Sequence, residues 1–440
     1  TSMDFRELIP EFFYFPDFLI NENHFDFGKL SKTGEVINDV HLPKWASSPT
    51  DFVCKNREAL ETPFVTLTLH HWINLIFGPN SRLPNSLEHD NVFHPYYYDS
   101  AIKDSDKSDA EIEIIREYAA CFGSAVHQLF KENPPNRLIS PVSFENSYFG
   151  EEKSVELHKN DAVISISPDC GDPKSVVLNS TLNFIDSSQN KGHLELKIPF
   201  ELEDMSRIEQ IAKISANAAI VSLPWDCAIY AFRLKSDEIK PSLISRMHNK
   251  KITTLAIGNK YFATGSEDCT IRIWSSQTFQ HLHLISKYRQ PITALEINEK
   301  LRICVGASAD GYISVNSMLN GESIRGTFVD MKDPTTINLS TFGYIVISAN
   351  GTTSGSRSIV MDQNLQFICN KTYEHSWITS TIIRWNDGND YLAIAMSNKK
   401  IQFYKLPFLQ KINSTIDTSK YTVTSMSFIR YDMRLIIGDD

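Results

Sequence analysis

Two groups of side chains in the first third of the chain have the chemistry for binding a metal ion. One is a run of carboxylates that lacks the glycine and the ligand spacing of a calcium loop, so we interpret it as the solvated start of a helix. The other is a group of histidines, which would bind zinc only if several of them converged, so we expect ordinary surface or core histidines. The carboxylates are Asp104, Asp106, Asp109, Glu111 and Glu113, and the histidines are His70, His71, His89 and His94.

Signatures of common catalytic sites are missing from the sequence. We find no Gly-x-Ser-x-Gly elbow, no glycine-rich phosphate loop ending in Gly-Lys-Ser/Thr and no His-Glu-x-x-His zinc helix. We therefore expect a protein that is not an enzyme and has no catalytic residues, metal or cofactor; the alternative is an enzyme acting on a lipid or phosphoester. The cysteines stand alone, without a Cys-x-x-Cys pair, as thiols in a reducing compartment do: Cys54, Cys121, Cys170, Cys227, Cys269, Cys304 and Cys369.

The composition is that of an ordinary globular protein. Of the 440 residues 42% are hydrophobic and 22% are charged, and the length favours two domains. Lys and Arg number 43 against 53 Asp and Glu, giving a formal net charge of −10, which disfavours binding to nucleic acid or anionic lipid through a broad basic face. The sequence has no apolar run long enough to cross a bilayer and no signal peptide, so we expect a cytoplasmic protein.

Helix start and stop signals dominate the first third of the chain. Ser48 and Thr62 each precede a proline, which suits the first position of a helix, and Ser108 begins a capping box. Apolar residues follow at helical spacing, and Gly78 ends the second helix. Trp72 falls on the apolar stripe of that helix, so we predict that it anchors a core. The first residues are already apolar, which we interpret as a start inside a domain.

Five ordered blocks in this region resemble the C-terminal half of a BEACH domain, the module shared by beige and neurobeachin proteins. They cover residues 1–135 in family order and spacing, whereas the N-terminal half of the domain is absent. The chain also departs from the family at Gly123, where a proline-containing helix start is common. The matching motif residues are Glu7, Pro10, Glu11, Asn38, Asp39, Pro43, Trp45, Arg57, Glu61, Trp72, Phe77, Gly78, Asn91 and Phe93.

From about residue 155 the pattern changes to short runs of β-branched and aromatic residues separated by turns, as in an all-β region. A turn Asp or Asn recurs before a strand about every 42 residues, the length of a propeller blade. The count predicts about seven blades, the last of them either incomplete or completed by a strand from residues 155–167. The turn residues are Asn179, Asp226, Asp268, Asp310 and Asn398.

One of these repeats closely resembles a WD repeat, with Trp274-Ser275 in place of the usual Trp-Asp. In that family a His, a Ser, the turn Asp and the strand Trp form a hydrogen-bonded tetrad. The resemblance assigns these roles to His248, Ser266, Asp268 and Trp274. We interpret the tetrad as structural, because no elbow presents Ser266 as a nucleophile. In the next repeat Asn316 stands at the position of the Trp.

The sequence therefore predicts a multidomain protein: a partial, mostly α-helical BEACH domain (1–135), a linker (136–154) and an all-β WD40-type propeller (155–440). By resemblance this pairing implies a non-enzymatic scaffold or adaptor in vesicle trafficking, lysosome-related organelle biology or autophagy, cytoplasmic and peripherally associated with endomembranes. We expect protein partners at the propeller rims, an intramolecular BEACH–propeller contact, no nucleic acid, and membrane contact made indirectly or through upstream domains. The alternative is a WD-repeat adaptor in a ubiquitin-ligase or signalling complex.

Overall fold

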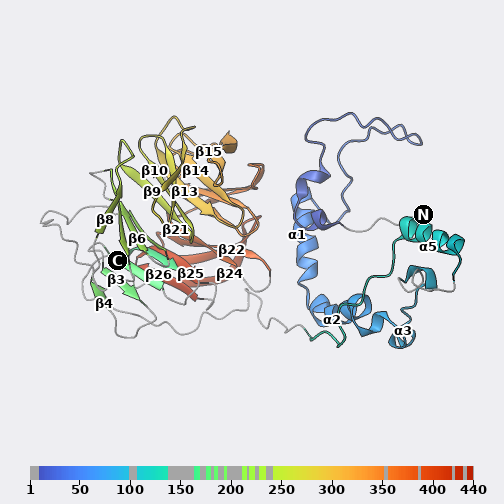
Figure 1. Ribbon diagram of the computed structural model, residues 1–440. Coiled ribbons are helices and arrows are strands. Elements are labelled where there is room, and N and C mark those ends of the chain that lie inside the picture. The colour runs from blue at the N-terminus through green and yellow to red at the C-terminus, as the bar shows by residue number, and fades with distance from the viewer. Residues whose placement is uncertain are drawn as a thin grey trace, which may run out of the picture. The chain divides into compact units, whose positions relative to one another are not determined.

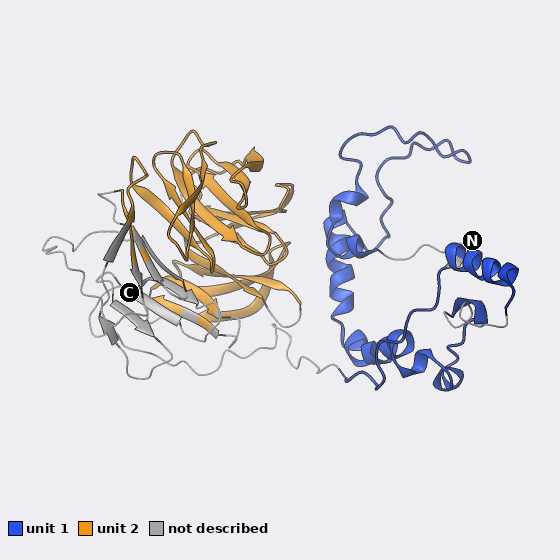
Figure 2. Cartoon of the chain, in the orientation of Figure 1, with its two compact units in different colours: residues 1–142 blue, residues 143–440 orange. Residues whose placement is uncertain are grey.

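The chain divides into two compact units, residues 1–142 (unit 1) and residues 143–440 (unit 2) (Figure 2). The predicted linker lies almost wholly outside the described residues, so its boundaries stay a prediction. The computed structural model describes residues 9–98, 107–136, 163–168, 175–179, 183–186, 193–195, 211–215, 218–222, 227–233, 241–350, 355–384, 388–418, 422–429 and 434–439.

Unit 1 is helical, as predicted. Its α-helices are α1 (Pro49–Leu60), α2 (Pro63–Phe77), α3 (Asn85–Glu88) and α5 (Asp109–Phe122) (Figure 1). In the described residues of unit 1, four short 3₁₀ helices accompany them: η1 (Pro10–Phe13), η2 (Pro16–Leu19), η3 (Pro79–Ser81) and η4 (Pro95–Tyr97). Long irregular stretches join these elements, and aromatic side chains hold some of them. Among these contacts, the ring centroid of Phe12 lies 5.2 Å from that of Phe18 and 5.9 Å from that of Phe52. The Phe52 ring in turn stacks on Trp45.

The three predicted helix starts are confirmed. Ser48 and Thr62 are N-caps whose side chains accept the N–H of Asp51 and Val65, and a proline follows each cap. Ser108 forms the full capping box with Glu111 at the start of α5. These caps satisfy backbone N–H groups that a helix leaves unpaired in its first turn, so each helix begins where its local sequence specifies.

Unit 2 consists of antiparallel sheets in which consecutive strands pair in sequence order. The first four sheets are β1 (Val163–Pro168), β2 (Ser175–Asn179), β3 (Asn183–Asp186), β4 (His193–Glu195); β5 (Ile211–Ser215), β6 (Ala218–Ser222), β7 (Ile229–Arg233), β8 (Pro241–Ser245); β9 (Ile252–Ile257), β10 (Tyr261–Ser266), β11 (Ile271–Ser275), β12 (His281–Ile285); and β13 (Ile292–Asn298), β14 (Ile303–Ser308), β15 (Tyr312–Ser317), β16 (Ser323–Phe328).

Three further sheets follow, and the last of them has two described strands. They are β17 (Thr336–Leu339), β18 (Ile345–Asn350), β19 (Ser356–Met361), β20 (Phe367–Tyr373); β21 (Trp377–Arg384), β22 (Asp390–Met396), β23 (Lys400–Lys405), β24 (Gln410–Asp417); and β25 (Val423–Ile429), β26 (Arg434–Asp439). The described strands form seven sheets, which is the predicted number of blades.

The sheets form a ring because the first strand of each sheet lies beside the first strand of the next, and β25 lies beside β1 (Figure 1). This arrangement corrects one alternative for the last blade. The described part of residues 155–167 lies in β1, which pairs with β2 at the head of the first sheet and does not hydrogen bond into the seventh sheet. The ring closes because the first strands of neighbouring sheets are in contact at every junction, including the one between the seventh sheet and the first.

The core of unit 2 lies between adjacent sheets. Alternating side chains of one sheet pack against those of the next, which gives buried apolar clusters between the third and fourth, fourth and fifth, and sixth and seventh sheets. The strands are short runs of Ile, Val, Leu and aromatic residues, the composition that favours half-buried pleated surfaces. Among the described residues, no helix of either unit is long and apolar enough to span a membrane.

Candidate functional site

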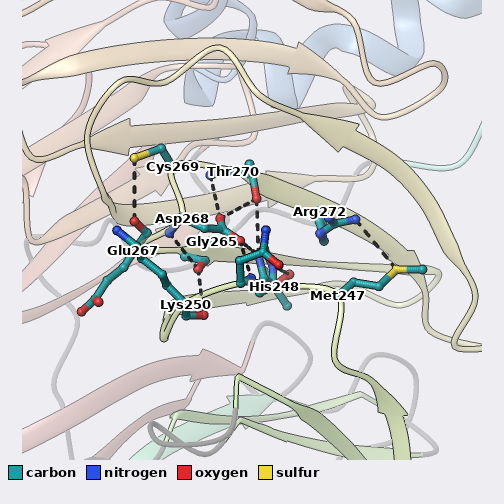
Figure 3. Close-up of polar contacts among 12 residues, drawn as sticks. Met247, His248, Lys250, Gly265, Glu267, Asp268, Cys269, Thr270 and Arg272 are labelled. Carbon is teal, nitrogen blue, oxygen red and sulfur yellow. Dashed lines mark hydrogen bonds and ion pairs between the residues drawn. The ribbon is translucent and has the colours of Figure 1, made fainter.

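A chain of polar side chains runs inward through the third sheet, and Figure 3 shows its outer end at His248, Asp268 and Thr270. His248 lies in the loop before β9, and Asp268 lies in the turn between β10 and β11. Thr264 on β10 and Trp274 on β11 continue the chain inward. Because these four residues come from a loop, a turn and two strands, their bonds tie the rim of the blade to its middle.

Short hydrogen bonds join the four side chains. The Nδ1 atom of His248 lies 2.9 Å from an oxygen of the Asp268 carboxylate, and its Nε2 atom lies 2.8 Å from Oγ1 of Thr264. The indole N–H of Trp274 donates to the same Oγ1 atom at 3.1 Å. Trp274 is buried and stacks against Phe262, which it faces across the β10–β11 ladder.

The hydrogen-bonding capacities of these groups fix the direction of the chain. Trp274 can only donate, so the Thr264 oxygen accepts from it and its own O–H is available for His248 Nε2. The ionised Asp268 can only accept, so His248 carries its proton on Nδ1. Every group is satisfied by one tautomer of a neutral histidine. A second proton on His248 would leave two donors facing the Thr264 oxygen.

The structure corrects the assignment of the hydroxyl in the predicted tetrad. Thr264, not Ser266, stands between the histidine and the tryptophan. Ser266 lies at the end of β10, where its hydroxyl donates to the carbonyl of Lys251 at 2.8 Å and accepts the N–H of Asp268 at 3.1 Å. The prediction went wrong by two residues, which on a strand means the same face but a different depth. The signal for Thr264 is the alternation of side chains along a strand. Phe262 faces Trp274 across the ladder, and Thr264, two residues further along β10, lies on the same face as Phe262.

Asp268 also holds its own turn. Its carboxylate accepts the N–H and the hydroxyl of Thr270 at 3.0 and 2.6 Å, and the N–H of Asn249 at 3.0 Å. Burial alone would raise the pKa of Asp268, but the hydrogen bonds from Thr270, His248 and Asn249 outweigh it and lower that pKa. Burial lowers the pKa of His248, and the Asp268 carboxylate only partly offsets this. Both shifts favour a neutral imidazole beside an ionised carboxylate.

The fourth sheet replaces this chain with different residues. Asn316 faces Cys304 across the β14–β15 ladder, just as Trp274 faces Phe262, so it holds the tryptophan position as predicted. Its amide donates to Ser314 Oγ at 2.9 Å, and that hydroxyl lies 2.7 Å from the Tyr288 hydroxyl. Tyr288 thus enters the blade junction where the preceding blade has His248. Sequence reasoning missed it because no motif marks a tyrosine in this role.

Gly306 makes the room for Tyr288. It lies at the position of Thr264, and a Cβ there would lie 2.5 Å from the Tyr288 hydroxyl oxygen and 2.3 Å from Ile271. Burial raises the pKa of Tyr288, so the phenol stays a neutral hydrogen-bonding group. The fourth blade therefore keeps a buried polar link without a histidine, a threonine or a tryptophan.

The remaining predicted turn residues are placed as follows. Asp310 accepts the hydroxyl of Ser308 at 2.6 Å and the N–H of Tyr312 at 3.2 Å in the β14–β15 turn. Asn398 accepts the N–H of Lys400 at 3.2 Å in the β22–β23 turn. Asn179 is the last residue of β2, and Asp226 lies outside the described residues. Where their side chains are described, these residues stabilise turns through Asx-type bonds.

In unit 1 several BEACH-like motif residues fix the backbone. The amide of Asn91 donates to the carbonyls of Leu75 and Asn80 at 2.7 and 3.0 Å, which ties the end of α2 to the segment after α3. Gly78 ends α2, and a Cβ there would lie 2.8 Å from the backbone of Asn74. Phe77 accepts the N–H groups of Leu129 and Phe130 on its carbonyl.

A second group of motif residues lies in the irregular stretch before α1 and at the ends of that helix. Asn38 and Asp39 accept from Asn21, at 2.9 and 2.8 Å. Arg57 donates to Cys54 Sγ at 3.4 Å, and Glu61 caps the end of α1. Pro10 begins η1, Glu11 accepts from Tyr14 and the Pro43 carbonyl accepts from Ala46, whereas Glu7 lies outside the described residues.

Three of the four aromatic motif residues of unit 1 are exposed, and Phe77 is half-buried. Trp72 is 62% exposed, and Phe93 and Trp45 are about half exposed. The prediction that Trp72 anchors a core is therefore wrong for the described structure. The buried residues of α2 are instead Thr66 and Asn74. They lie on the side of the helix that makes contacts, which include the 2.7 Å hydrogen bond from Asn74 to Asn133. On the apolar stripe of α2, Trp72 and Ile76 are exposed, whereas Val65, Leu69 and Ile73 are half-buried.

The candidate metal ligands that lie among the described residues do not assemble into a site, and Asp104 and Asp106 lie outside these residues. Among the described residues, no group of three or more His, Cys, Asp or Glu side chains is placed to hold a metal ion. His70 and His71 lie next to each other with ring centroids 3.8 Å apart, and His94 Nδ1 accepts the N–H of Tyr96. The six described cysteines are free thiols.

Comparison with known proteins matches both units. Residues 1–137 match the Beige/BEACH domain model, and residues 240–275 match the model of the WD domain, G-beta repeat. Beige protein homolog 1 of Schizosaccharomyces pombe is 30% identical over 340 residues, Protein SPIRRIG of Arabidopsis thaliana 29% over 352, and the BEACH domain-containing protein lvsD of Dictyostelium discoideum 26% over 402.

These alignments include 73–74% of this chain, and the chain spans 12%, 10% and 14%, respectively, of the length of the three relatives. Among solved structures, the computationally designed Ika8 protein aligns with 64% of this chain and 94% of its own at 16% identity, with a TM-score of 0.48.

Proposed function

We propose that this chain, a BEACH–WD40 protein of the beige type, is a non-enzymatic scaffold whose propeller binds protein partners in vesicle trafficking, lysosome-related organelle biology or autophagy. Proteins of this family are generally scaffolds or adaptors. The proposal places the protein in the cytoplasm, peripherally associated with endomembranes through its partners or through further domains.

One observation carries the proposal: the ring of sheets in unit 2 closes through contact of β25 with β1. A closed propeller presents its loops on two rigid faces around a ring, which suits the docking of other proteins. The bonds from Asp268 to Asn249, His248 and Thr270 fix the rim loops of the third sheet, so less ordering free energy is lost when a partner binds there.

The experiment is proximity labelling. The chain, fused to a biotin ligase, is expressed in a eukaryotic cell beside the ligase fused to an unrelated propeller of similar size. We expect the labelled proteins to be enriched in components of membrane traffic over this control. Enrichment in ubiquitin-ligase subunits without membrane-traffic proteins would overturn the proposal in favour of the adaptor alternative.

A second measurement tests the indirect nature of membrane contact. We expect the purified chain to stay in the supernatant when it is centrifuged with bare liposomes at physiological salt, because its net charge of −10 opposes binding to anionic lipid. Sedimentation with the liposomes would contradict this part of the proposal.

A further inference from the structure

Five basic side chains lie on two adjacent loops of the propeller, in a chain whose net charge is −10. Each loop joins the last strand of one sheet to the first strand of the next: residues 246–251 join β8 to β9, and residues 286–291 join β12 to β13. Four of the five are exposed and Lys251 is half-buried. We call Arg246, Lys250, Lys251, Lys287 and Arg289 the basic rim.

The two loops lie at the same end of neighbouring strands. β9 and β13 are adjacent, and the hydroxyl of Thr253 at the start of β9 donates to the carbonyl of Ile292 at the start of β13. The second loop is held down by the buried side chain of Tyr288, which lies between Lys287 and Arg289 in sequence and packs among apolar residues of the third and fourth sheets. The basic rim is therefore one surface at the junction of these two sheets.

The charges of the basic rim are not neutralised by the protein. Within the part of the chain that the structure describes, none of the five basic side chains forms an ion pair. The nearby carboxylates have other partners: Asp268 bonds to His248 and Thr270, and Asp310 bonds to Ser308. In the two turns beside the rim, β10–β11 and β14–β15, Glu267 is the one remaining carboxylate.

The neighbouring loop shows that this charge pattern is local. Residues 329–335, between the fourth and fifth sheets, carry Asp330 and Asp333 beside Lys332, and Asp330 pairs with Arg357 at 3.5 Å. The positive surface thus stops before the junction of the fourth and fifth sheets. A ligand that gains from all five charges must fit within the span of two loops.

We propose that the basic rim binds an acidic, extended peptide segment of a protein partner. A narrow acidic strand can contact the five charges without approaching the rest of this acidic protein, whereas a flat anionic membrane would face the whole surface and its net repulsion. Beyond about 8 Å that repulsion is screened at physiological salt, so a ligand confined to the rim avoids most of it. The rim is preorganised, since Glu267 N–H bonds to the Lys251 carbonyl and Asn249 N–H to Asp268.

This inference rests on the proposed scaffold function and specifies the chemistry of one partner. The test uses the whole chain and a short fluorescein-labelled peptide of alternating glutamate and glycine, with the glutamine and glycine peptide as its uncharged match. Fluorescence anisotropy is measured at low and at physiological salt. We expect saturable binding of the glutamate peptide that weakens with salt, and no binding of the glutamine peptide.

Charge-reversed variants locate the binding. Lys287→Glu/Arg289→Glu should weaken binding of the glutamate peptide by at least about fivefold. The matched control is Lys300→Glu/Arg302→Glu, which makes the same change of charge in the exposed β13–β14 turn at the other end of the same sheet, and it should leave binding within about twofold. Lys250→Glu, on the other loop, is the second test should the double variant fail to fold by circular dichroism.

Three results would overturn the inference. The first is equal affinity for the two peptides, and the second is an equal loss of affinity in the control variant. The third is binding to phosphatidylserine vesicles that the rim variant abolishes, while the glutamate peptide does not bind. Proximity labelling separates this failure from a failure of the scaffold proposal. If labelling of membrane-traffic proteins persists when the peptide does not bind, the inference alone is wrong.

Discussion

The two units differ in how their apolar residues are used. Unit 2 buries a nearly continuous set between its sheets, while the described part of unit 1 buries four apolar side chains: Leu19, Val53, Cys54 and Ile115. Unit 1 also exposes Phe64, Leu67, Trp72 and many other large apolar residues. Capped helices therefore do not by themselves make a stable domain, because helices gain most of their stability from packing of an apolar face.

The strongest test of this difference compares alanine variants of two tryptophans, one from each unit. Trp274→Ala should destabilise unit 2 by about 3–5 kcal/mol, because it removes a buried side chain that is 1% exposed. Trp72→Ala should change the free energy of unfolding by less than about 0.5 kcal/mol, because that side chain is exposed on α2. Urea denaturation followed by circular dichroism measures both.

Equal losses of unfolding free energy in the two variants would contradict the difference in burial between the two units. A large effect of Trp72→Ala would mean that the stripe of α2 is covered in solution. A small effect of Trp274→Ala would mean that the third sheet does not depend on its polar chain or on the Phe262 contact.

Loss of the turn carboxylate should have the next largest effect. Asp268→Ala removes the acceptor of His248, Thr270 and Asn249 and deprives the buried His248 imidazole of its carboxylate partner, so we expect a loss of about 1–3 kcal/mol. Glu267→Ala is the control, since it alters the neighbouring residue of the same turn without touching these bonds. Differential scanning calorimetry compares the two variants, and similar melting temperatures would remove the case for a buried network.

Local signals in the sequence were enough for the elements but not for the packing. The caps at Ser48, Thr62 and Ser108 act within one turn of helix, and the strand before and after Asp268 follows from composition and turn chemistry, so both were predictable. The exposure of Trp72 was not, because periodicity marks an apolar face without saying what covers it. Thr264 and Tyr288 were missed for a related reason: their roles depend on depth within a sheet and on space left by Gly306 in another strand.

The stability of unit 2 should depend on pH. The pKa of His248 in the folded state lies below its value in the unfolded chain, so below about pH 6.5 the unfolded state binds more protons and the folded state loses stability as the pH falls. The lowered pKa of Asp268 acts in the same direction at more acidic pH, below about 3.8.

We therefore expect the free energy of unfolding of unit 2 to fall between pH 6.5 and pH 5, with a slope of at most about 1.4 kcal/mol per pH unit for each proton bound. His248→Asn should flatten that slope. His71→Asn, on the exposed side of α2, should leave it unchanged. Denaturation curves at several pH values measure it, and a slope that is the same in both variants would show that other groups control the acid sensitivity.

The smallest expected effect separates the helices of unit 1 from one another. Ser48→Ala removes the cap that accepts the Asp51 N–H and should cost α1 about 1 kcal/mol, which lowers hydrogen-exchange protection of its amides about fivefold. Because few buried apolar side chains couple α1 to α5, the amides of α5 should keep their protection, and Ser108→Ala should produce the reverse pattern. Parallel loss in both helices would mean that unit 1 unfolds cooperatively despite its small described core. The contrast with the propeller would then lie in surface chemistry and not in packing.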